Sequence, residues 1–171
     1  ALSLGYRDEQ GLYLNSYLKR HSASFNVDDQ IKSWLKVGGS LSYNSQKENL
    51  VDTNDQVPRR MVEDFPFLPV IHTGGPLEGL YANNRDYPSA EGTRNSYNQL
   101  VSRSYILNTN TTTGSMYLNT DITPDLQMRT IVGANIMEQN RNEFTDSRLS
   151  SSDIARAGSS LNKQTFWSFE N

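Results

Sequence analysis

Two stretches of the sequence, about ninety residues apart, follow the same plan of strand, tight turn and strand. The first is FNVDDQIKSWLKVGGSLSY (25–43), and the second is YLNTDITPDLQMRTIVGANI (117–136). In both, apolar and polar residues alternate on either side of a polar segment. Alternation with a period of two is typical of a β-strand that has one apolar and one polar face. Each stretch therefore predicts an antiparallel hairpin.

The same alternation extends over most of the chain. We expect strands at 1–8, 17–27, 35–44, 112–121 and 126–138, and a last strand from about residue 163. The turns are predicted at 28–33 in the first hairpin and at 122–125 in the second, where Pro124 and Asp125 supply turn chemistry. Helical periodicity is hard to find. The predicted fold class is all-β, an antiparallel meander of about six long strands.

Two long connections separate these strands. One covers 47–103 and is rich in Pro, Asn, Asp, Arg and Gly, and the other covers about 141–162. Compact domains rarely keep connections of this length unless the connections have a function or are disordered. Short turns and long loops thus alternate, as they do at the two ends of outer-membrane barrels. Strands of about ten residues also have the length that crosses a bilayer at a tilt of about 45°.

The composition excludes several classes of protein. The 16 basic and 19 acidic residues give a net charge of -3, which provides no positive field for nucleic acid. Zero cysteines exclude disulfides, thiolate catalysis and cysteine zinc sites. The most apolar run, FPFLPVIHTGGPL (65–77), is interrupted by prolines and is too short for a transmembrane helix. A transmembrane barrel stays compatible with the low hydropathy, because its strands carry polar residues at every second position.

Four blocks resemble, in their order along the chain, the SusC/RagA family of TonB-dependent outer-membrane transporters. The blocks are YLKRHSASFNVDDQIKSWLKVGGSLSYNSQ (17–46), RRMVEDFPFLPV (59–70), GLYANNRDYPSAEGTRN (79–95) and NTTTGSMYLNTDITPDLQMRTIVGANI (110–136). No single block is decisive, and the resemblance rests on their order over nearly the whole chain. One departure is Asn95-Ser96, where the family often has Asn-Pro.

The resemblance implies a fold and a role. Residues 1–171 would form early strands of a large transmembrane barrel in the outer membrane of a Gram-negative cell, and the signal peptide, the plug and the remaining strands would lie outside this chain. The start at Ala1, without an initiator methionine, and the end within a strand pattern, TFWSFEN, agree with that expectation. The family imports large nutrients, which are glycans in most branches and peptides in others. The implied partners are a SusD-like surface lipoprotein, the TonB complex, a glycan or peptide ligand and outer-membrane lipid, and no cofactor is expected.

The first long connection holds the candidate ligand contacts. Aromatic rings supply flat apolar area, while amide and guanidinium groups supply directed hydrogen bonds, so such a set suits a sugar or a peptide at the barrel mouth. The candidates are Arg59, Arg60, Tyr81, Asn84, Arg85, Tyr87 and Arg94, with Asn83 and Asp86 in the same set. Packing within the loop, or contact with a lid, would use the same side chains, so these interpretations stay open.

Enzymatic chemistry is not expected. The sequence has no G-x-S-x-G nucleophile elbow. Glu63 and Asp64 are adjacent, and neighbouring side chains of an extended segment point to opposite sides. His21 and His72 are the only histidines and are far apart, so no metal site is expected. We assign His21 to a lipid-side or interface face and His72 to a turn in the long loop.

The aromatic residues of the first hairpin allow two interpretations. Phe25 and Tyr43 fall on its apolar face, where they would form a girdle at the headgroup level or make ordinary cross-strand contacts. Trp34 has the opposite parity from Leu35, which places it at the turn or facing the lumen. For the whole chain, the alternative to a transporter barrel is a soluble all-β carbohydrate-binding or adhesion module, in which two sheets pack face to face.

Overall fold

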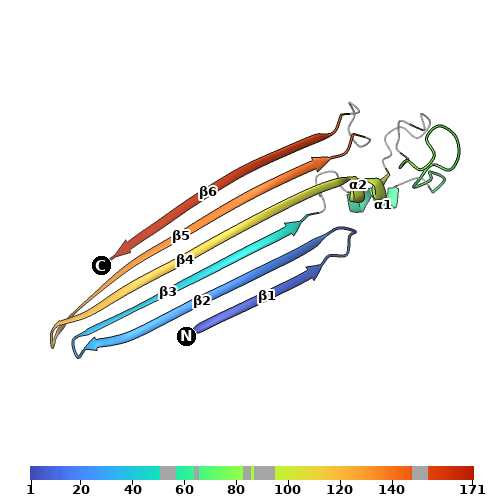
Figure 1. The fold of residues 1–171 in the computed structure, drawn as a ribbon. Helices are drawn as coiled ribbons and strands as arrows, with labels where there is room; N and C mark the ends of the chain where they lie inside the picture. Colours follow the sequence, from blue (N-terminus) through green and yellow to red (C-terminus); the bar gives the residue numbers. More distant parts are fainter. Residues whose placement is uncertain (51–56, 64–65, 83–85, 87–94, 148–153) are drawn as a thin grey trace.

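A computed structural model describes the backbone of residues 1–50, 57–63, 66–82, 86, 95–147 and 154–171, with the side chains of all these residues except Arg60. Six strands form one antiparallel sheet in the order β1-β2-β3-β4-β5-β6, which confirms the predicted all-β meander. The strands are β1 (Leu2–Gln10), β2 (Tyr17–Lys32), β3 (Leu35–Asn49), β4 (Arg103–Thr123), β5 (Leu126–Thr145) and β6 (Arg156–Glu170). The sheet is a single curved layer, and β1 and β6 are its edges (Figure 1).

The strands are longer than the alternation predicted, so several of their boundaries differ from the prediction. Of the turn predicted at 28–33, residues 28–32 belong to β2, and the turn itself is Ser33 and Trp34. Backbone pairing with β3 continues through these polar residues, so their composition does not end the strand. The predicted turn at Pro124 and Asp125 is confirmed. The second connection is shorter than predicted, because β5 runs to Thr145 and β6 begins at Arg156.

The register sorts the side chains onto two faces. Across all six strands, residues such as Leu2, Phe25, Leu41, Ala134 and Trp167 lie in one row on the same face, which we name the apolar face. Its apolar band consists of Leu2, Leu4, Ala23, Phe25, Val27, Val37, Leu41, Tyr43, Met116, Leu118, Val132, Ala134, Ile136, Trp167 and Phe169.

The other face, which we name the polar face, carries serine, threonine, asparagine and glutamine together with charged side chains such as Arg20, Asp28 and Arg129, and a few apolar side chains lie between them. Its side chains hydrogen-bond across strands: the Ser40 and Ser115 hydroxyls lie 2.8 Å apart, and Asn135 Nδ2 donates to Thr113 Oγ1 at 2.7 Å. The alternation along each strand therefore becomes a two-sided sheet, because the register is continuous from strand to strand.

No second layer covers the apolar band within the part of the chain that the structure describes. Trp167 is 77% exposed, Leu4 75% and Met116 72%. The only buried apolar side chains among the described residues are Val57, Ala82 and Leu100, all at one end of the sheet. The sheet thus presents a large apolar surface that the described part of the chain does not bury.

Two short helices, which the sequence pattern did not predict, lie at the end of the sheet where the long connection leaves β3 (Figure 1). They are α1 (Val57–Glu63) and α2 (Ser96–Ser102), and α2 leads directly into β4. With seven residues each, they are too short for a helical period to stand out. No helix among the described residues is long and apolar enough to cross a membrane.

Candidate functional site at the loop end of the sheet

The described part of the long connection gathers at one end of the sheet, which we name the loop end. Helix α2 begins here with Asn95 as its N-cap, and the Asn95 side chain accepts a hydrogen bond from the Asn98 amide at 2.9 Å. The Asn95 side-chain amide also donates to the Val70 carbonyl at 2.8 Å, which ties the loop to the helix. Ser96 is the first helical residue, a position that favours proline. Here the helix begins at that position with serine in place of proline.

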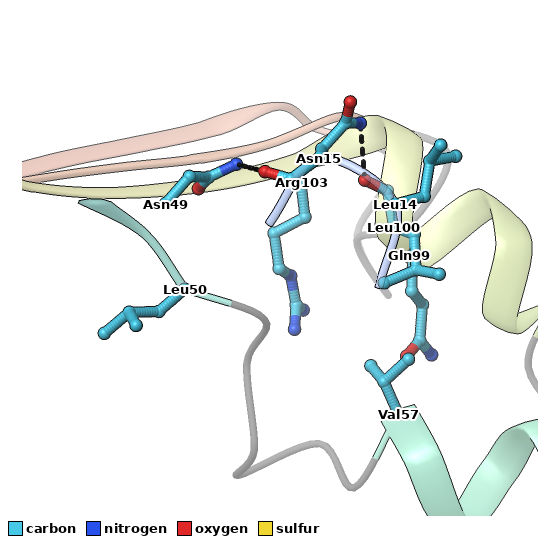
Figure 2. Close-up of a pocket in the computed structure, with 8 residues that line it drawn as sticks. All are labelled: Leu14, Asn15, Asn49, Leu50, Val57, Gln99, Leu100 and Arg103. Carbon is cyan, nitrogen blue, oxygen red and sulfur yellow. Dashed lines mark hydrogen bonds between the residues drawn. The ribbon is translucent and has the colours of Figure 1, made fainter. Parts of the chain in front are cut away.

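Two asparagines connect four segments at this end: the end of β3, the β1–β2 turn, α2 and β4. Figure 2 shows the bonds that join the first three of them. Asn49, at the end of β3, donates from Nδ2 to the Asn15 carbonyl at 2.8 Å and accepts from the Tyr105 amide at 2.9 Å. Asn15 lies in the turn between β1 and β2 and donates to the Leu100 carbonyl of α2 at 3.0 Å. Its φ of 63° is left-handed, a conformation that asparagine tolerates better than other residues with a side chain. The pair fixes α2 against the turn between β1 and β2.

A cavity of about 20 Å³ lies beneath this network, lined by Leu14, Asn15, Asn49, Leu50, Val57, Gln99, Leu100 and Arg103. Figure 2 shows the Arg103 side chain extending between Leu50 on one side and Gln99 and Val57 on the other. Gln99 is 3% exposed, and its two polar atoms have no hydrogen-bond partner among the described residues. A cavity of this volume has room for about one water molecule, so it cannot hold a nutrient.

A larger and more open hollow of about 380 Å³ lies beside the turn between β1 and β2, lined by Glu9, Gln10, Gly11, Ser16, Tyr17, Leu18, Glu48, Asn49 and Leu50. Its volume falls in the range of small-molecule sites, about 300–1,000 Å³. Asn49 and Leu50 line both this hollow and the small cavity. Two carboxylates, one phenol and two side-chain amides line this hollow, which suits a polar ligand rather than an apolar one.

The middle of the long connection forms a small two-stranded turn. Ile71 and Tyr81 form a β-bridge, and the His72 amide donates to the Leu80 carbonyl at 2.9 Å. Gly74, Gly75 and Gly79 have φ near 80°, which glycine adopts without strain. The His72 imidazole lies 2.8 Å from the Asp86 carboxylate, and both side chains are about nine-tenths buried. His72, which the sequence analysis assigned to a turn in the long loop, therefore ties that loop together through Asp86, a partner that the sequence analysis did not predict.

Only part of the predicted ligand set lies within the described residues. Arg59 is on α1 and forms an ion pair with Glu63 at 2.6 Å, and Tyr81 is half-buried with its ring 5.9 Å from that of Tyr97. Both contacts are made within the long connection. The remaining predicted positions, Asn83, Asn84, Arg85, Tyr87 and Arg94, lie outside the described residues, as does the Arg60 side chain.

Other predicted positions fall on the sheet or its turns. His21 lies on the apolar face with its ring 4.9 Å from that of Tyr6, and Phe25 and Tyr43 lie on the same face, as predicted. Trp34 lies in the turn, which agrees with its parity. The described residues contain no group of three or more carboxylates and histidines that could hold a metal ion.

No protein-family model and no curated protein matches this chain. The sequence reasoning missed Asn15 and Asn49, whose hydrogen bonds connect the segments of the loop end, and Gln99, which lines the small cavity. For Asn15, the signal was its place in a short polar connection, since asparagine is frequent at left-handed turn positions. For Asn49 and Gln99 the sequence offers no such signal, because only the folded sheet and α2 bring these residues to the loop end.

Proposed function

We propose that this sheet is a section of the wall of a transmembrane β-barrel in a SusC/RagA-like, TonB-dependent importer of large nutrients. In this proposal the apolar face contacts lipid and the polar face lines the interior. The single observation that carries the proposal is the apolar band, which continues in register across all six strands and which the described part of the chain leaves uncovered. Such a band stabilises a sheet in lipid and destabilises it in water.

The height of the band supports a bilayer. On the apolar face of β2, charged side chains bound the band at Lys19 and at Asp29, ten positions further on. At about 3.4 Å per residue, ten residues extend about 34 Å along the strand. A tilt of about 45° reduces this to about 24 Å along the membrane normal. The outward apolar band of outer-membrane barrels is about 25 Å tall.

The strands extend past this band toward the loop end. β4 has 21 residues and β5 has 20, whereas about 9–11 residues suffice to cross the hydrocarbon. Beyond the band, the apolar face carries Lys47, Asn108, Glu138 and Lys163 instead. The loop end therefore stands in water outside the bilayer, with the hollow beside the β1–β2 turn and the packed loop above the membrane surface.

The proposed cargo follows from the resemblance. Glycans, or alternatively peptides, would enter from the loop end, with a SusD-like lipoprotein as the closing partner and the TonB complex as the source of energy. The amides and hydroxyls of the polar face suit such cargo, because these groups exchange hydrogen bonds with hydrated ligands, and the charged side chains on the same face supply further donors and acceptors. This function needs no covalent chemistry from the described residues.

Nitroxide labels test the orientation of the two faces. The chain has no cysteine, so Leu41→Cys and Val132→Cys each introduce one labelling site in it, and Ser42→Cys and Asn135→Cys are matched positions on the polar face. In the intact protein in lipid, labels at 41 and 132 should collide more with oxygen than with a water-soluble nickel chelate, and labels at 42 and 135 should show the reverse. Free access of the chelate to positions 41 and 132 would refute the proposal. Shielding of these two positions from both reagents would favour a soluble module with a second sheet over this face.

A further inference from the structure

One row of side chains on the apolar face places two positive charges directly opposite each other. Asp8, Lys19, Lys47 and Asn108 are neighbours in this row, from β1 to β4. Like charges directly opposite each other destabilise a sheet. The Asp8 carboxylate offsets one of them, since it lies 3.4 Å from the Lys19 ammonium. Lys47 is exposed and has no ion-pair partner among the described residues.

We infer that Lys19 and Lys47 bind the phosphate of an anionic lipid headgroup, with the Asn108 amide as a further donor; this inference rests on the proposed function. A phosphate between the two ammonium groups turns the repulsion into two charge-assisted hydrogen bonds. The Lys19 side chain is 50% exposed and Lys47 is exposed as well, so the site is open to a ligand from the side of the apolar face.

The position of the row favours a lipid over a soluble anion. Lys19 lies four residues beyond Ala23, and Lys47 lies four residues beyond Tyr43, on the same face as the apolar band. Four residues extend about 14 Å along a strand, or about 10 Å along the membrane normal at a tilt of about 45°. The headgroup layer is about 5–7 Å thick on each side, and lysine stems can bend back toward it. A lipid whose acyl chains cover the band therefore brings its phosphate to these two ammonium groups.

Spin-labelled lipids test this inference with the intact protein in bilayers. The measurement is the association constant of spin-labelled phosphatidylglycerol relative to spin-labelled phosphatidylcholine, for the wild type, Lys19→Gln, Lys47→Gln and the double variant. Lys36→Gln is the matched control, because Lys36 is on the same strand as Lys47 but on the polar face. We expect each substitution at 19 or 47 to lower the preference for phosphatidylglycerol about fivefold, and Lys36→Gln to leave it unchanged.

Two results would overturn the inference: an unchanged preference in the double variant, or an equal loss in Lys36→Gln. Soluble glycerophosphate that competes as well as the lipid would also refute it, since the acyl chains would then contribute nothing. The label at position 41 separates this test from the proposed function. If that label reports lipid while the preference is unchanged, only the headgroup site fails, and if it reports bulk water, both fail.

Discussion

Asn49 holds the end of β3 through its side chain, which makes it the best place to test the loop end. Its Oδ1 accepts from the Tyr105 amide at 2.9 Å, and its Nδ2 donates to the Asn15 carbonyl at 2.8 Å. Asn49→Ala removes both bonds. A hydrogen bond contributes about 1 kcal/mol net, so the free energy of local opening should fall by about 2 kcal/mol. Each 1.4 kcal/mol is a factor of ten, and the Tyr105 amide should therefore exchange with solvent about 30-fold faster.

Hydrogen exchange at the Tyr105 amide reads this change directly, because Asn49 Oδ1 is the acceptor of that amide. Asn49→Asp keeps an acceptor and loses the donor, so the Tyr105 amide should stay protected to within about fivefold of the wild type. Asn142→Ala is a control, since the side-chain bond of Asn142 to Asn140 is exposed and reaches no other segment. Wild-type exchange at Tyr105 in Asn49→Ala would show that the side chain does not fasten this end of the sheet.

Three further substitutions test other parts of the reasoning. Asn15→Ala should lower the free energy of unfolding, measured by denaturant titration, by about 1 kcal/mol more than Asn15→Gly does. Both variants lose the hydrogen bond to α2, but only glycine accepts a φ of 63° without cost. Equal losses in the two variants would refute the argument from backbone conformation. Gly38→Ala should destabilise the sheet, because an added methyl group there overlaps with the ring of Tyr117, whereas Gly158→Ala should not, because a methyl group there meets open space. The same denaturant titration compares the two variants, and equal stability would contradict the close approach of Tyr117 to Gly38. Val132→Arg should reduce the stability of the protein in lipid by about 2–4 kcal/mol, whereas Ser42→Arg on the polar face should be close to neutral; a tolerated arginine at 132 would count against contact with acyl chains.

The sequence predicted the hairpins because their cause is local. Side chains two apart share a face, so the pattern of Leu126, Met128 and Val132 is visible without knowledge of the partner strand. The turn at 28–33 was misplaced because two aspartates have low strand propensity, while pairing with β3 outweighs that propensity in the folded sheet. Strand propensity is a property of each residue alone, whereas pairing depends on a second strand elsewhere in the sequence.

The loop end could not be predicted in the same way. Asn49 contacts Asn15 across 34 positions and the Tyr105 amide across 56, and the pairing of β3 with β4 brings these residues together. The candidate ligand residues were chosen for chemistry and proximity in sequence. The two candidates whose side chains the structure describes, Arg59 and Tyr81, contact neighbours within the long connection. The chemistry of a side chain shows that it is able to bind a ligand, but it does not show whether the folded chain already gives that side chain a partner.

The two edges of the sheet have a consequence for handling the protein. β1 and β6 each present one row of backbone amides and carbonyls that no described strand pairs. Because such a row is a template for any other strand, a solution of these 171 residues without companion strands should add copies edge to edge, with no geometry that ends the addition. Material prepared this way should form ribbons of indefinite length, and the extent of this association should depend on the protein concentration more than on pH.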